Sequence, residues 1–246
     1  MPLRETLRTQ GEWLFKQRSW LPLVFAPIVV LGFMQFSYLH DSRAHDRWWS
    51  LGCALVCAAG LAIRAVTTGS TPRRTSGRNT KGQVADSLNT TGMYSLVRNP
   101  LYVGNFVAGL GVSLYLHTWW VAAAFTIFYW GYYERIVFAE EEFLREKFGA
   151  EYLAYAEKTP AFFPRFSARR PAALPFSWKT VLKREYQTVF GAVVIFCAFG
   201  IAGDSVAARA FTVDTLWIAV FGASLLGYAV LRVLRKMTRV LHVQGR

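Results

Sequence analysis

Six apolar stretches alternate with polar and charged stretches along the 246-residue chain. They cover residues 20–39, 48–65, 100–116, 119–138, 188–203 and 211–231. About 20 helical residues cross a hydrocarbon core of about 30 Å, because a helix rises about 1.5 Å per residue. The pattern predicts an all-α, polytopic membrane protein with about six transmembrane helices. A re-entrant hairpin formed by the third and fourth stretches stays open as an alternative, since only His117 and Thr118 separate them.

Residues 139–158 follow a different pattern. Leu144, Phe148, Tyr152 and Tyr155 recur at helical spacing, and the intervening positions are mostly charged. Such a stripe predicts an amphipathic helix, for which a position on the lipid headgroups of the cytoplasmic surface is the plainest interpretation.

Composition supports a membrane protein. Hydrophobic residues make up 53% of the chain and aromatic residues 16%, whereas charged residues make up 17%, against about 25% in soluble domains. A soluble domain and a disordered chain are both excluded on these grounds. Cys53, Cys57 and Cys197 all lie within apolar stretches, so neither a disulfide framework nor a metal site is predicted.

The net charge is +13, and the distribution of the basic residues along the chain predicts the orientation. With six crossings, all but Arg43, Arg47 and Arg209 of the 28 Lys and Arg residues fall on one side. Because basic loops stay in the cytoplasm, we expect both termini there and a single membrane domain over residues 1–246. The basic charge then indicates anionic lipid headgroups, and no nucleic acid partner is expected.

Residues 92–104, GMYSLVRNPLYVG, start the third stretch. Asn99 suits a helix N-cap and Pro100 the first helical position. Arg98 next to a helix N-terminus forms a site for a carboxylate or phosphate, although snorkelling of its side chain to the headgroups explains it equally well.

Two further features have both a structural and a functional explanation. Gly109 and Gly111, after Gly104, indicate close helix packing or the approach of a cofactor to the backbone. Glu140, followed by Glu141 and Glu142, begins either a solvated helix face or the wall of a pocket for a cationic or hydroxyl-rich ligand.

Together these motifs resemble a known family. GMYSLVRNPLYVGN, then Gly109-Leu110-Gly111, then EEEFLREKFGAEYLAYAEKTPAFFP are similar to the integral-membrane superfamily of isoprenylcysteine carboxyl methyltransferases and phospholipid methyltransferases. The matching positions are Gly92, Tyr94, Arg98, Pro100, Tyr102, Glu140, Glu141, Leu144, Phe148, Gly149, Tyr152, Tyr155, Pro160 and Pro164. The resemblance covers residues 60–166, and residues 167–246 add a pair of transmembrane helices outside it.

The resemblance implies a methyltransferase that uses S-adenosylmethionine at the cytoplasmic membrane boundary. It implies cofactor-binding roles for Tyr94, Arg98, Asn99, Tyr102, Gly109, Gly111, Glu140 and Glu141, with Arg98, Asn99 and Tyr102 as the catalytic residues. The family usually has His where this chain has Asn99, and Asn cannot carry a proton. An anionic oxygen needs no general base, so the substitution favours a carboxylate or phosphate acceptor over an amine.

The loop before residue 92 indicates the acceptor. Arg73, Arg74, Arg78 and Lys81 among hydroxyls and glycines form a plausible cradle for a phosphate, although a basic loop that only fixes topology explains them equally well. The loop also looks similar to bacterial relatives that methylate the 1-phosphate of lipid A, which implies a bacterial inner membrane. An isoprenylcysteine carboxylate is the second possible acceptor and a phospholipid amine the third.

Two classes outside methyl transfer stay open. A transporter or membrane scaffold is disfavoured because the apolar stretches carry almost no ionisable residue, Asp214 near one end apart. A membrane reductase with a nicotinamide cofactor would also use a phosphate-binding pair such as Arg73 and Arg74.

Overall fold

The computed structural model describes residues 2–72, 75 and 83–245, and these residues form helices and connecting segments without a strand. The α-helices are α1 (Leu3–Gln17), α2 (Ala26–Phe33), α3 (Arg43–Gly69), α4 (Pro100–Leu114), α5 (Trp119–Phe148), α6 (Ala150–Lys158), α7 (Trp178–Ala208) and α8 (Thr215–Met237). Four short 3-10 helices lie between them: η1 (Leu21–Phe25), η2 (Leu39–Asp41), η3 (Met93–Ser95) and η4 (Phe166–Ala168). The predicted all-α fold is confirmed.

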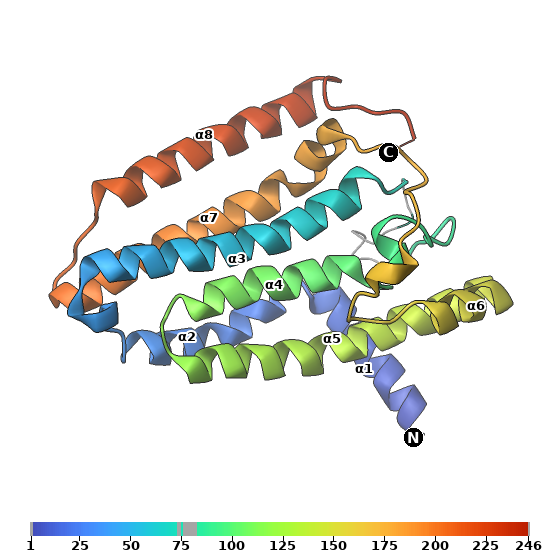
Figure 1. The fold of residues 1–246 in the computed structure, drawn as a ribbon, viewed down its shortest axis with the longest axis horizontal. Helices are drawn as coiled ribbons and strands as arrows, with labels where there is room; N and C mark the ends of the chain where they lie inside the picture. Colours follow the sequence, from blue (N-terminus) through green and yellow to red (C-terminus); the bar gives the residue numbers. More distant parts are fainter. Residues whose placement is uncertain (1, 73–74, 76–82, 246) are drawn as a thin grey trace.

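The helices pack in a serial order. Helix α8 lies along α7, α7 packs on α3, α3 on α4, α4 on α5, and α1 crosses α5. Both chain ends lie at the same end of this bundle, and the turn between α4 and α5 lies at the other end (Figure 1). The C-terminal pair of helices, α7 and α8, therefore contacts the rest of the bundle mainly through α3.

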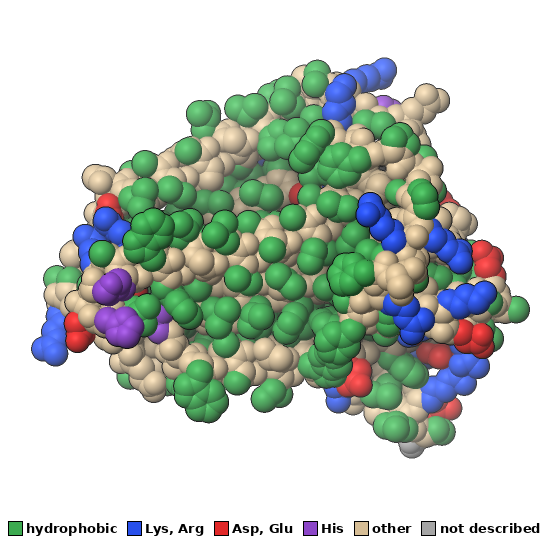
Figure 2. Space-filling model, viewed as in Figure 1, with side chains coloured by type: hydrophobic (Ala, Val, Ile, Leu, Met, Phe, Trp, Pro, Cys, Tyr) green, Lys and Arg blue, Asp and Glu red, His purple; other side chains and the backbone are tan. Residues whose placement is uncertain are grey.

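Among the described residues, three helices, α3, α7 and α8, are long and apolar enough to cross a membrane. The apolar helices at residues 23–33 and Pro100–Leu114 are shorter. Pro27 lies in the first turn of α2, which follows η1 directly, so the stretch at residues 20–39 forms short helices rather than one long one. Hydrophobic side chains cover the middle of the face in Figure 2, and charged side chains gather at its two ends, as expected for a membrane protein.

Glycines allow α3 and α4 to approach closely. A Cβ atom on Gly111 would lie 2.6 Å from the carbonyl oxygen of Cys53 and the amide nitrogen of Cys57. A Cβ on Gly109 would lie 2.4 Å from the ring of Phe125 on α5. Gly109 and Gly111 therefore serve helix packing, because other helices fill the space beside them. Their approach to a cofactor stays a prediction.

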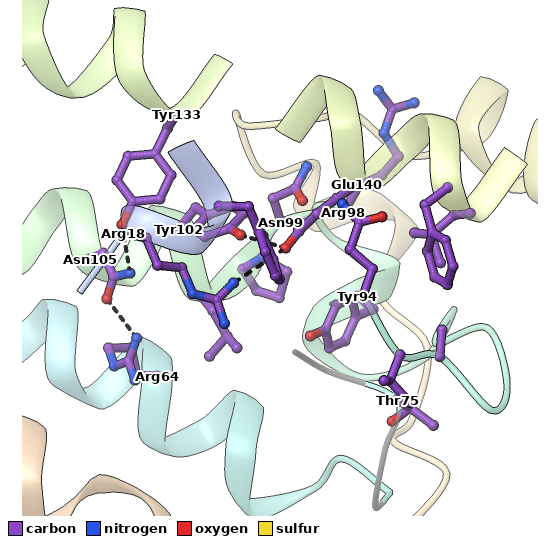
Figure 3. Close-up of a pocket in the computed structure, with 18 of the residues that line it drawn as sticks. Arg18, Arg64, Thr75, Tyr94, Arg98, Asn99, Tyr102, Asn105, Tyr133 and Glu140 are labelled. Carbon is purple, nitrogen blue, oxygen red and sulfur yellow. Dashed lines mark hydrogen bonds and ion pairs between the residues drawn. The ribbon is translucent and has the colours of Figure 1, made fainter. Parts of the chain in front are cut away.

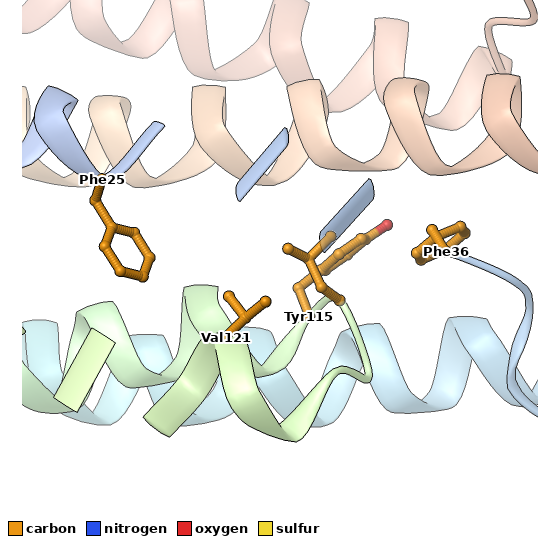
Figure 4. Packing of buried hydrophobic residues seen from close by; sticks show 5 residues of the cluster. Phe25, Phe36, Tyr115 and Val121 are labelled. Atoms are coloured by element: carbon orange, nitrogen blue, oxygen red, sulfur yellow. The ribbon is translucent and has the colours of Figure 1, made fainter. Parts of the chain in front are cut away.

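An apolar cluster closes the end of the bundle opposite the termini. Phe25, Phe36, Tyr115, Leu116 and Val121 are buried together where α4 turns into α5 (Figure 4). The intervening turn contains His117 in the left-handed region, with φ 57°. Charged groups surround this cluster as well, because Arg43 pairs with Asp204 and Asp214 at the same end of the bundle.

The predicted amphipathic helix consists of the last turns of α5 and all of α6. Gly149 separates the two helices, and its φ of +52° explains why a glycine occupies the break. Tyr152 is buried, and the Tyr155 hydroxyl donates to the carbonyl oxygen of Tyr94 at 2.7 Å. The aromatic stripe therefore packs against the segment around η3 rather than on headgroups.

Replacement of Gly111 tests the packing of α3 against α4. We expect Gly111→Ala to lower the free energy of unfolding by about 1–3 kcal/mol, because the added methyl overlaps backbone atoms of α3. Gly191→Ala on α7 is the matched control, since no atom lies within 4 Å of its added Cβ. Thermal unfolding in detergent should show Gly191→Ala unchanged or up to about 1 kcal/mol more stable. Equal effects of the two substitutions would contradict the packing role.

Candidate functional site

A cavity of about 700 Å³ lies at the end of the bundle that holds the termini. Its volume is within the range of small-molecule sites. Residues from α1, α3, α4 and the segment before it, α5 and α7 line the cavity, among them those labelled in Figure 3. A smaller space of about 50 Å³ shares Tyr94, Arg98 and Asn99 with the cavity and extends to Tyr152 and Tyr155.

Arg98 joins the segment before α4 to α5 and α6. Its Nε lies 3.0 Å from Glu141 Oε1, and its Nη2 donates to Glu141 Oε2 at 3.2 Å. Its Nη1 donates to the carbonyl oxygen of Ala156 at 2.9 Å, and its backbone amide donates to Pro160. The guanidinium fork is therefore paired with a carboxylate of the protein itself, so Arg98 and Glu141 neutralise each other.

Asn99 differs from its expected capping role. It occupies the N-cap position of α4, but its side chain makes no capping hydrogen bond. The Nδ2 group donates instead to the carbonyl oxygen of Ala161 at 3.2 Å. The predicted side-chain cap is wrong because the chain after α6 runs back beside this segment and accepts the amide. Pro100, whose missing N–H suits a first helical position, begins the helix.

Glu140 and Tyr102 form a second polar group in the cavity. The Tyr102 hydroxyl donates to Glu140 Oε1 at 2.7 Å, and Arg18 Nη1 lies 3.8 Å from the same oxygen. Burial raises the pKa of Glu140 to about 7, against the opposing effects of the Tyr102 hydrogen bond and the charge of Arg18, and the neighbouring Glu141 adds to the rise. Glu140 therefore changes charge near neutral pH.

A buried network lies on the other side of the cavity. Arg64 on α3 donates from Nε and Nη2 to Glu185 Oε2 on α7 at 2.9 and 2.8 Å, and from Nη1 to Asn105 at 2.6 Å. Asn105 in turn donates to the Tyr133 hydroxyl at 3.4 Å. The sequence analysis missed these four residues, and it also missed Arg18. The one available signal was a lone Arg and a lone Glu close to the ends of two apolar stretches.

Helix α1 is held along α5 by charge and by close packing. Arg4 bonds to Glu142 and Arg8 to Glu146. A Cβ on Gly11 would lie 2.0 Å from the carbonyl oxygen of Arg135 on α5. Each of the three consecutive carboxylates Glu140 to Glu142 thus pairs with an arginine, and two of the three arginines come from α1 or the residue at its end.

The structure brings Tyr94, Arg98, Asn99, Tyr102 and Glu140 together around the cavity. Glu141 lines only the adjoining space. Arg73, Arg74, Arg78 and Lys81, expected to bind the acceptor, lie outside the described residues. Within the described parts of the chain, no three His, Cys, Asp or Glu side chains are grouped as they would be to hold a metal ion.

These features define a helical membrane protein with a polar, ligand-sized cavity at one end of its bundle, and comparison with known proteins gives its relationship. Residues 49–151 match the family described as phospholipid methyltransferase. A protein-S-isoprenylcysteine O-methyltransferase of Schizosaccharomyces pombe is 34% identical over 75 residues, which are 30% of this chain and 32% of that protein. The resemblance to the isoprenylcysteine and phospholipid methyltransferase superfamily is confirmed by these matches.

Two bacterial proteins match a longer segment. The nickel-cobalt-cadmium resistance protein NccN of Alcaligenes xylosoxydans xylosoxydans is 33% identical over 129 residues, 51% of this chain and 58% of that protein. The cobalt-zinc-cadmium resistance protein CzcN of Cupriavidus metallidurans is 33% identical over 142 residues, 58% of this chain and 63% of that protein. The match therefore spans about three fifths of these relatives. No solved structure matches the chain.

The buried network predicts a strong stability effect. We expect Glu185→Ala to lower the free energy of unfolding by about 3–5 kcal/mol, because it leaves the Arg64 charge buried without its carboxylate. Removing both charges in Arg64→Met with Glu185→Leu should restore most of the loss. Thermal unfolding of Arg64→Met, Glu185→Leu and the double variant in detergent measures the coupling. Additive losses would contradict the paired role.

Proposed function

We propose that this protein is an S-adenosylmethionine-dependent membrane methyltransferase that transfers a methyl group to an anionic oxygen of a lipid. The match to the phospholipid methyltransferase family and the similarity to isoprenylcysteine O-methyltransferases support the reaction class. One structural observation carries the proposal further. Tyr94, Arg98, Asn99, Tyr102 and Glu140, which are up to 46 positions apart, line one cavity of about 700 Å³.

The cavity residues fit the donor chemically. S-adenosylmethionine carries a sulfonium and an ammonium, and Glu140 is an acidic partner for either. The ring of Tyr102 is suited to a cation–π contact, worth about 1–2 kcal/mol when water is excluded. Glu141 is neutralised by Arg98, so we assign it an indirect role that holds Arg98 and the segment before α4 against the cavity.

S-adenosylmethionine would supply the methyl group when bound, and its transfer from the sulfonium is an in-line displacement. The protein's part is to align the acceptor and exclude water. An acceptor that is already anionic needs no general base. This agrees with Asn99, whose side-chain amide donates a hydrogen bond and cannot take up a proton. Tyr94 and Tyr102 add aromatic rings to the same cavity wall.

For the acceptor we propose the 1-phosphate of lipid A, with an isoprenylcysteine carboxylate and a phospholipid amine as alternatives. The basic loop residues Arg73, Arg74, Arg78 and Lys81 support a phosphate. The similarity to isoprenylcysteine O-methyltransferases supports a carboxylate. Both of these favoured acceptors are anionic oxygens at the end of a lipid.

We further propose a bacterial inner membrane with the cavity and both termini on the cytoplasmic side. The excess of Lys and Arg on that side of the predicted topology supports the orientation. The two termini lie at one end of the bundle together with the cavity, as an even number of crossings requires (Figure 1).

Transfer of a labelled methyl group tests the function. The purified protein in detergent is mixed with labelled S-adenosylmethionine and a bacterial lipid extract that contains lipid A. We expect label in a phosphate-bearing lipid. Label in phosphatidylethanolamine would make the phospholipid amine the acceptor instead of the lipid A phosphate. Absence of both transfer and donor binding would overturn the methyltransferase, and nicotinamide binding would then be measured before a transporter or scaffold is considered.

Glu141→Gln tests the indirect role of that carboxylate. We expect donor affinity to fall about tenfold, because Arg98 loses its charged partner next to the cavity. Glu146→Gln, which removes an exposed carboxylate on the same helix, should leave donor affinity unchanged. Equilibrium binding of labelled donor gives the comparison, and unaltered affinity in Glu141→Gln would contradict the role.

Glu140 predicts a pH dependence of donor binding. A cationic donor is favoured by ionised Glu140, whose pKa lies at about 7, so affinity should approach its full value at about pH 8. Below pH 7 it should fall by up to about tenfold per unit, as the carboxyl takes up a proton. Binding measured between pH 5.5 and 8 should lose this dependence in Glu140→Gln. The same slope in the variant would assign the titration to another group.

A further inference from the structure

Tyr102, whose ring is assigned to the donor, is held at three points. Its hydroxyl donates to Glu140 Oε1 at 2.7 Å. Its ring contacts the ring of Tyr133 on α5, with the ring centroids 4.6 Å apart and an interplanar angle of 53°. Its backbone carbonyl oxygen accepts a hydrogen bond from the Tyr129 hydroxyl at 2.6 Å. The orientation of the Tyr102 ring therefore depends on two tyrosines of α5 as well as on Glu140.

Tyr133 is itself held from two sides. Its ring stacks on the ring of Tyr129, one helical turn earlier on α5, with the centroids 4.0 Å apart and an interplanar angle of 29°. Its hydroxyl accepts from Asn105 Nδ2 on α4 at 3.4 Å. Because stacking orients the ring and the hydrogen bond fixes its far end, Tyr133 presents a defined surface to Tyr102.

The hydrogen bonds behind Tyr133 continue to α3 and α7. Asn105 accepts from Arg64 Nη1 at 2.6 Å, and Arg64 pairs with Glu185 at 2.8 Å. Figure 3 shows this chain of side chains from Arg64 through Asn105 to Tyr133. Glu185 lies on α7, beyond the residues 49–151 that match the methyltransferase family. The support of Tyr133 thus begins on a helix outside the matched segment.

An oriented ring matters because both Tyr102 and Tyr133 line the cavity of about 700 Å³. A cation–π contact needs the cation over the face of the ring, within about 6 Å of its centre. A ring that turned freely in a cavity of this size would meet that geometry only part of the time, and ordering it on binding would lower the affinity. The contact with Tyr133 removes this freedom before a ligand arrives.

We propose that Tyr133 is a positioning residue for the methyl donor: held by Asn105 and Tyr129, it keeps the ring of Tyr102 in the orientation that binds the sulfonium of S-adenosylmethionine. This inference rests on the proposed function. Tyr133 acts through Tyr102 and is not assigned a contact with the donor. The Arg64 network, which stabilises the fold, thereby also contributes to donor binding.

A double-mutant cycle tests the inference by equilibrium binding of labelled S-adenosylmethionine to the protein in detergent at pH 8. We expect Tyr133→Leu to raise the Kd about five- to tenfold, because the Tyr102 ring loses its support. In the Tyr102→Leu background the same substitution should change the Kd less than about twofold, since the ring that Tyr133 positions is gone. Tyr133→Phe, which keeps the ring, should stay within about threefold of the wild type.

The pH profile of donor binding gives a readout that a general loss of stability does not move. Burial raises the pKa of Glu140, the Tyr102 hydrogen bond and the charge of Arg18 lower it, and Glu141 raises it. A Tyr102 side chain that turns away no longer donates to Glu140, so the pKa of Glu140 rises. The midpoint of donor binding should therefore lie at higher pH in Tyr133→Leu than in the wild type.

Tyr228→Leu is the matched control. Tyr228 on α8 is half-buried like Tyr133, and its ring stacks on Phe190 with the centroids 4.6 Å apart, outside the lining of the cavity. The Kd for the donor and the pH midpoint should not change in this variant. Thermal unfolding checks that each variant is folded. Tyr133→Met, which fills more of the same space without a ring, replaces Tyr133→Leu if the latter does not fold.

The outcomes separate the inference from the proposed function. An unchanged Kd in Tyr133→Leu overturns the inference. An equal loss of affinity with and without the Tyr102 ring also overturns it, because Tyr133 would then act independently of Tyr102. A loss in Tyr133→Phe as large as that in Tyr133→Leu contradicts the role of the ring contact. Failure of the wild-type protein to bind the donor overturns the proposed function instead.

Discussion

Three adjacent carboxylates near the C-terminal end of α5 constrain the whole site. Glu140, Glu141 and Glu142 repel each other and would be costly to desolvate without partners. Successive residues on a helix point about 100° apart, so the three side chains reach different neighbours. These neighbours are Arg18 at the end of α1, Arg98 before α4 and Arg4 at the start of α1. Pairing these charges therefore determines which segments surround the end of α5.

The same pairing decides which cavity groups are available for chemistry. Arg98 and Glu141 satisfy each other, as do Arg64 and Glu185, so these pairs hold the walls in place. The contact between Arg18 and Glu140 is longer, and burial raises the pKa of Glu140 to about 7. One anionic and one cationic group thus face the cavity side by side.

The segments outside the matched residues 49–151 complete the cavity. Helix α1 contributes Phe15 and is followed by Arg18, and α7 contributes Gln187 and Thr188 to the lining. Glu185 on α7 holds Arg64 from the matched segment. Helix α8 packs on α7, with Gly200 accommodating the ring of Trp217, and buries no residue of its own. The two C-terminal helices therefore have different roles: α7 lines the cavity, and α8 packs on the outer side of α7.

Hydrophobic periodicity, composition and two motifs were enough to determine the all-α membrane fold, the superfamily and the cavity residues Tyr94, Arg98, Asn99, Tyr102 and Glu140, because these depend on local sequence. The pairing of Arg98 with Glu141, the packing role of Gly111 and the position of Arg18 were decided by tertiary structure. Each of these depends on which helix lies opposite, at separations of 43 residues for Arg98 and Glu141. Periodicity identifies the buried face of a helix, but the neighbour is selected by packing and charge across the whole chain.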